Sequence, residues 1–108
     1  MSDAISSSIT DYQAVIYGED GTSAIGAYIH CFHEGRNVVT CVFHNESNVP
    51  RNRLNADGRV ELHYPISRFP FVIDILRNEE PLFFVFIEAT GSGYIATNKE
   101  GVGDGERT

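Results

Sequence analysis

The sequence is poor in basic residues and contains no long apolar run. It has 8 Lys and Arg against 15 Asp and Glu, which gives a formal net charge of −7 at pH 7. Because phosphate neutralisation requires a basic surface, this composition argues against nucleic-acid binding. No segment approaches the ~20 apolar residues of a membrane-spanning helix. The N-terminal residues also lack the basic segment and apolar core of a signal peptide. We therefore expect a cytoplasmic protein that has no membrane contact.

Cysteine is also scarce, with two in 108 residues. A chain of this length can fold as a single domain without disulfide crosslinks, so we expect one domain over residues 1–108. Residues 1–10 are polar and predict an N-terminal lead-in. Residues 98–108 form a glycine-rich acidic tail, whose composition predicts flexibility. The folded part is therefore expected between these two ends.

The stretch from Ser67 to Glu88 predicts a short helix followed by a strand. Pro70 fits the first turn of a helix, where a missing N–H costs nothing. One apolar stripe follows at helical spacing, made of Phe69, Val72, Ile73 and Leu76. The helix is expected over residues 70–78, because Pro81 blocks its continuation. Residues 82–87 are wholly apolar, aromatic and β-branched, which indicates a central strand.

Five further segments have the composition of strands and lie between glycine- or asparagine-rich turns. They are residues 12–17, 23–33, 38–44, 59–66 and 94–97. The predicted order is thus β-β-β-β-α-β-β, with mostly antiparallel pairing. The fold class is mainly β (α+β), in the form of a small six-stranded barrel or a bent sheet.

The second and third predicted strands are apolar on both faces, and a single short helix cannot cover both. Barrel closure or a homodimer would supply the missing cover. The first functional hypothesis is therefore a non-enzymatic interaction module that acts as a homodimer. The uncovered apolar strands could also bind another protein as a partner.

A second hypothesis is small-molecule binding. Tyrosines at the mouth of a barrel could line a ligand site, with an arginine beside them. The candidates are Tyr28, Tyr64, Tyr94 and Arg68. Core packing is the alternative explanation for the aromatic residues. The arginines at 51, 53, 59 and 68 make the middle of the chain locally basic. They could contact an acidic partner or RNA, or lie in a solvated loop.

A third hypothesis is a metal- or thiol-dependent enzyme. His and Cys alternate in His30-Cys31-Phe32-His33 and again in Cys41-Val42-Phe43-His44. Pairing about a turn at 34–37 places His30 opposite Cys41, which makes this pair the candidate metal or nucleophile site, and such an enzyme would be built on His30, Cys41 and His63. A register shifted by one residue would instead allow a disulfide between Cys31 and Cys41. Structural burial of these residues is the alternative, and the sequence predicts no cofactor.

The last third of the chain resembles a family of small uncharacterised bacterial proteins. The resemblance rests on Ile75-Leu-Arg-Asn-Glu79 with Pro81, on Tyr94-Ile-Ala-Thr97, and on Val102-Gly103-Asp-Gly105-Glu106. In that family these segments read ILRNExP, YIST and PVGEGE, and Gly101 here stands where the family has proline. The resemblance implies a bacterial protein whose tail is a family feature ordered against the barrel, and it attaches no activity.

Overall fold

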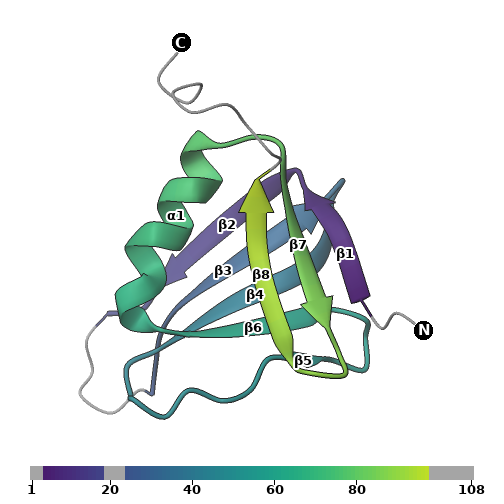
Figure 1. Cartoon of the computed structure of the whole chain (residues 1–108). Helices are drawn as coiled ribbons and strands as arrows, with labels where there is room; N and C mark the ends of the chain where they lie inside the picture. Colours follow the sequence, from purple (N-terminus) through teal and green to yellow (C-terminus); the bar gives the residue numbers. More distant parts are fainter. Residues whose placement is uncertain (1–3, 19–23, 98–108) are drawn as a thin grey trace.

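The computed structural model describes residues 4–18 and 24–97, in which eight strands and one α-helix form two layers (Figure 1). The first layer is a five-stranded sheet in the order β2-β3-β4-β6-β5. The second layer is a three-stranded sheet in the order β1-β7-β8, with α1 beside it. The strands are β1 (Ala4–Ile9), β2 (Asp11–Ile16), β3 (Ile25–His33), β4 (Arg36–His44), β5 (Arg53–Leu54), β6 (Val60–Pro65), β7 (Leu82–Ile87) and β8 (Ser92–Thr97).

Pairing within both sheets is antiparallel except between β4 and β6, which run parallel. The prediction of a mainly β, α+β fold is confirmed, and all six predicted strands are present. The chain does not close into a barrel. It forms two facing sheets, which agrees with the bent-sheet alternative of the prediction. Closure is absent because the chain crosses from one sheet to the other at Thr10 and again through α1.

Two strands were missed in the sequence. β1 lies in the polar lead-in, where isoleucines alternate with serines; Ile5 and Ile9 pack against the core. β5 has only two residues and pairs with the start of β6. The predicted tail at 98–108 lies outside the described residues.

The helix α1 (Phe69–Asn78) follows a 3-10 turn (Ile66–Arg68) and confirms the predicted helix. Pro70 lies in its first turn, and Val72 and Leu76 are buried against the sheet. Phe69 packs edge-to-face against Phe43 of β4, with ring centroids 5.1 Å apart. Within the described part of the chain, no helix is both long and apolar enough to cross a membrane.

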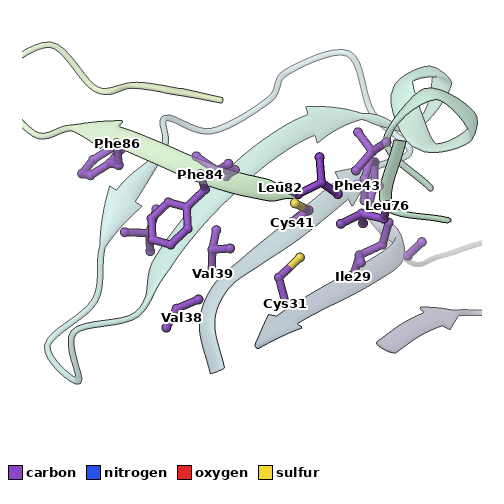
Figure 2. Close-up of a cluster of buried hydrophobic side chains, with 14 residues drawn as sticks. Ile29, Cys31, Val38, Val39, Cys41, Phe43, Leu76, Leu82, Phe84 and Phe86 are labelled. Atoms are coloured by element: carbon purple, nitrogen blue, oxygen red, sulfur yellow. The ribbon is translucent and has the colours of Figure 1, made fainter. Parts of the chain in front are cut away.

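The core lies between the inner faces of the two sheets and under α1 (Figure 2). β7 contributes Phe84 and Phe86, both 1% exposed; Phe84 points toward Val39 of the other layer, and Leu82 of β7 lies beside Cys41. The layers approach closely at Gly93 of β8, where a Cβ would overlap Cδ2 of the buried Leu62. Because the two inner faces cover each other in this way, each sheet has only its outer face available to solvent or to a partner.

Candidate functional site

The turn between β3 and β4 fixes which residues share a face. It consists of Glu34 and Gly35, which both have positive φ angles, 49° and 87°. This turn is two residues shorter than the predicted one at 34–37, and an irregularity follows between Cys31 and Phe32. As a result His30 pairs with Thr40, and Cys41 pairs with Ile29.

The predicted metal pair of His30 and Cys41 is therefore wrong. His30 lies on the outer face of the five-stranded sheet, whereas Cys41 lies on its inner face and is 0% exposed. Cys31 joins Cys41 in the core, and both are free thiols (Figure 2). The hydrogen bond with Cys31, together with burial, raises the pKa of Cys41 well above its usual value. A buried thiol held protonated in this way cannot act as the predicted nucleophile.

The predicted ligand residues do not converge. Tyr28 lies on the outer face of the five-stranded sheet, stacked on His30. Tyr64 stacks on Phe43 at the inner face, and burial raises its pKa. Tyr94 is exposed on the outer face of the other sheet, opposite Val85. Arg68 is exposed and precedes α1. No barrel mouth gathers them.

The outer face of the five-stranded sheet instead carries a hydrogen-bonded polar cluster centred on Glu61 of β6. Its carboxylate accepts hydrogen bonds from Arg53 (3.1 Å), Asn55 (2.9 Å) and Arg59 (3.4 Å). Burial raises the pKa of Glu61, but the Asn55 hydrogen bond, the Arg53 charge and the His63 hydrogen bond outweigh it. The pKa of Glu61 therefore lies below its usual value, and the carboxylate is ionised at neutral pH.

Two histidines extend this cluster toward the end of β4. His63 Nε2 lies 3.2 Å from Glu61 Oε1, and His63 Nδ1 lies 2.8 Å from His44 Nε2. Because the carboxylate can only accept, His63 carries its proton on Nε2 and accepts at Nδ1 from His44. Burial lowers the pKa of His63, so this ring is neutral at neutral pH.

The remainder of the polar face links the cluster to β3. His30 Nδ1 donates to Thr40 Oγ1 at 3.0 Å, and that hydroxyl donates in turn to Asn37. Burial and the charge of Arg59 both lower the pKa of His30. The Arg59 Nε atom is buried and has no hydrogen-bond partner. We use the name polar face for Tyr28, His30, Thr40, Val42, His44, Arg53, Arg59, Glu61 and His63.

The outer face of the three-stranded sheet has the opposite character. Register and burial place apolar side chains of β7 between the alanines and serines of its two neighbours, with Tyr94 of β8 as the one large exception. Tyr94 and the half-buried Val85 lie at its centre. We use the name apolar face for Ala4, Ser6, Ser8, Phe83, Val85, Ile87, Ser92, Tyr94 and Ala96; it carries no Asp, Glu, Lys, Arg or His.

A cavity of about 680 Å³ opens at the rim where the two sheets meet. It is lined by residues 8–12, at the crossing from β1 to β2, and by residues 76–82, at the end of α1. Its lining includes the apolar residues Ile9 and Leu82, and it carries Asp11, Glu79 and Glu80 against the single basic residue Arg77. None of the predicted ligand residues lines it.

The sequence reasoning missed Glu61 and His44 as site residues. The signal was present in the alternation of residues 59–66, which places Glu61 and His63 on one side of the strand. It was not used because the partner strand of β6, namely β4, runs parallel and is distant in sequence. Among the described residues, no group of three or more His, Cys, Asp or Glu side chains is arranged to hold a metal ion.

Comparison with protein-family models, curated proteins and solved structures finds no match for this chain. The resemblance to small bacterial proteins stays a prediction.

Proposed function

We propose that the protein is a small interaction module of the bacterial cytoplasm that pairs with a second copy of itself through the apolar face. The observation that carries this proposal is the absence of charge on nine neighbouring positions, in a chain with a net charge of −7. Two copies repel each other wherever their acidic surfaces meet. An uncharged sheet face is where a like-charged copy can dock with the least electrostatic cost.

The size of the face supports a dimer of modest affinity. Three strands of six residues, at about 3.3 Å per residue and about 4.8 Å between strands, span roughly 20 Å by 15 Å. Two such faces would pack across a two-fold axis with their sheets about 10 Å apart. This is about 300 Å² per copy and about 600 Å² for the pair, below the ~1,200 Å² at which stable specific interfaces begin, so we expect a weak, reversible monomer–dimer equilibrium.

Sedimentation velocity over a wide concentration range tests the proposal. The wild-type chain should shift from monomer to dimer as concentration rises. Val85→Glu and Tyr94→Glu should each leave a folded monomer, because they place a charge at the centre of the face. Gln13→Glu is the matched control, since it adds the same charge at an exposed strand position of the other sheet and should still dimerise.

A wild-type chain that stays monomeric at every concentration would contradict the proposal. So would a Val85→Glu variant that dimerises as well as the wild type. Circular dichroism confirms that each variant is folded before its mass is interpreted.

The rim cavity favours a second candidate function, the binding of a small cationic molecule. Its volume of about 680 Å³ lies within the range of small-molecule sites. Three carboxylates and the C-terminal end of α1 give it negative potential, while Ile9 and Leu82 offer apolar contact.

Phenethylamine and phenylacetate are matched probes for this cavity, because they share an aromatic ring and differ in the sign of their charge. In heteronuclear NMR, phenethylamine should shift the amides of residues 8–12 and 76–82, and phenylacetate should not. Equal effects of the two probes, or shifts spread over both sheets, would contradict this function.

A further inference from the structure

Ser8, His33 and Glu34 come together where the end of β1 lies beside the end of β3 (Figure 1). Ser8 Oγ lies 2.9 Å from His33 Nδ1, although the two residues are 25 positions apart and belong to different sheets. His33 Nε2 lies 3.8 Å from Glu34 Oε1. A hydroxyl bonded to an imidazole whose other nitrogen faces a carboxylate is the order of groups that activates a serine as a nucleophile.

The positions of the protons in this row follow from its acceptors. The Glu34 carboxylate can only accept, so it favours the His33 tautomer that carries its proton on Nε2. His33 Nδ1 is then the acceptor, and the Ser8 hydroxyl donates to it. A serine that donates to an imidazole can pass its proton to that ring while its oxygen attacks a substrate.

Thr10, at the crossing between the two sheets, holds the turn that carries His33 and Glu34. Its Oγ1 accepts a hydrogen bond from the Glu34 backbone N–H at 2.9 Å, and it lies 3.2 Å from the Phe32 carbonyl oxygen, to which it can donate. The turn itself is tight, since Glu34 has a positive φ of 49°. The base and its carboxylate are therefore fixed against β1 before a substrate arrives, as a reactive site requires.

The row is open to a substrate and adjoins the rim cavity. Ser8 is exposed, and the His33 side chain is 39% exposed. Ser8 also belongs to the lining of the cavity, together with the carboxylates of Asp11, Glu79 and Glu80. A small molecule whose carbonyl group reaches Ser8 can therefore place a positive charge among these carboxylates.

We propose that Ser8 is a nucleophile that accepts the acyl group of a small ester or thioester whose leaving group is positively charged. His33 is its general base, and Glu34 is a positioning residue for His33. This activity goes beyond the proposed self-association. Its preference for a cation rests on the binding function proposed for the rim cavity.

The reaction has two balanced steps. Ser8 Oγ forms a bond to the carbonyl carbon while its proton passes to His33 Nδ1. The bond from that carbon to the leaving oxygen or sulfur breaks, and the leaving group takes the proton from His33. Water then attacks the acyl-serine, gives a proton to His33 and releases the carboxylic acid, after which His33 returns the proton to Ser8 Oγ.

Acetylthiocholine tests the site, and S-(3,3-dimethylbutyl) thioacetate is an uncharged probe of the same shape. The full chain is used at low concentration, where the monomer dominates. Thiol release measures the rate, and mass spectrometry of acid-quenched protein should place one acetyl group on Ser8. After each rate is divided by the rate of the same probe with free imidazole, the charged probe should react about ten-fold faster or more.

Variants separate the roles of the three side chains. Ser8→Ala should abolish acetyl transfer, and His33→Gln should slow it by about a hundred-fold because the general base is lost. Ser6→Ala is the matched control, since it removes a hydroxyl from the same side of the same strand and should react as the wild type does. In imidazole nitrogen NMR, His33 should carry its proton on Nε2 in the wild type and show both tautomers in Glu34→Gln.

The proposal is overturned if no acetyl group is transferred, if Ser8→Ala reacts as fast as the wild type, or if both probes react at the same normalised rate. The phenethylamine titration separates this failure from that of the cavity. If phenethylamine still shifts the amides of residues 8–12 and 76–82 when no acetyl transfer occurs, the nucleophile is wrong and the binding function stands.

Discussion

The two sheets share one core but present opposite outer surfaces. The polar face on the five-stranded sheet contains Glu61, with two arginines, and three histidines in hydrogen-bonded rows. The apolar face on the three-stranded sheet holds no such charge. Both arise from the same alternation of side chains along strands.

The two sheets differ in how their outward-facing side chains are stabilised. On the five-stranded sheet the polar side chains satisfy one another, so that Thr40 and His44 are buried although they point away from the core. On the three-stranded sheet the outward side chains are mostly small or apolar, with one hydrogen bond between Ser8 and His33, and burial against another surface is the main further stabilisation open to them. The side chains of the first face are bonded to one another, whereas the second face is the one through which we propose that two copies associate.

The largest expected effect separates the inner from the outer side of β7. Phe84 is 1% exposed, and Phe84→Ala should cost about 3–5 kcal/mol of unfolding free energy because it leaves a cavity between the sheets. Val85 is its neighbour on the apolar face, and Val85→Ala should cost about 0.5–1 kcal/mol. Urea unfolding at low protein concentration, where the monomer dominates, measures both.

Equal costs for the two variants would break the comparison, because they would mean that both sides of β7 are core. Phe86→Ala provides a second inner-face variant, and its cost should match that of Phe84→Ala.

An intermediate effect is expected on the polar face. Glu61→Ala leaves Arg53, Arg59 and Asn55 without their shared acceptor, which should cost about 1–3 kcal/mol. Glu88→Ala removes an exposed carboxylate and should change stability by less than about 0.5 kcal/mol. Thermal unfolding of the two variants under one set of conditions compares their losses of stability. A Glu61→Ala variant as stable as Glu88→Ala would show that the cluster contributes nothing to the fold.

Most of the fold was predictable because its signals are local. Pro70, the apolar stripe after it and Pro81 define α1, and six strands follow from composition and alternation. β1 was not predictable in this way, since Ser7 occupies an inner position between Ile5 and Ile9 and breaks the apolar alternation, and only the pairing with β7 reveals the strand. The two-sheet arrangement was also beyond local signals, because it depends on where the chain crosses between layers.

The candidate site was less predictable, because it depends on register and on long-range pairing. The turn is two residues shorter than expected, and the irregularity between Cys31 and Phe32 shifts the register back by one residue; the two together place Thr40 opposite His30 and put Cys41 on the other face. The hydrogen bond between the His44 and His63 side chains forms because β4 and β6 run parallel. The two strands are joined by a connection of fifteen residues at 45–59. The aromatic strand 82–87 predicted burial on both sides, whereas the structure buries one side and leaves Val85 on the other.

The smallest expected effect is a pH dependence that belongs to the polar face alone. Burial lowers the pKa of both His63 and His30 below the ordinary value of 6.5. The groups that act on the pKa of His63 are His44, Glu61 and the charge of Arg53. The charge of Arg59 acts on the pKa of His30. As pH falls through 6.5, the unfolded chain takes up protons that the folded chain still refuses, so the free energy of unfolding decreases. This contribution is fully present above 6.5 and is lost toward the lowered pKa values.

Urea titrations on either side of pH 6.5 should therefore show the wild type less stable on the acid side, with a smaller loss in His63→Gln and in His30→Gln. His33→Gln is the matched control that removes a histidine outside the polar face, with a side chain that is 39% exposed. The proposed dimerisation should change little over the same range, since none of the nine residues of the apolar face is a histidine or a carboxylate and only Ser8, on the edge strand β1, contacts a histidine. If stability and dimerisation instead fell together with pH, the two faces would be coupled through the core that they share. The polar face and the apolar face would then not act independently of each other.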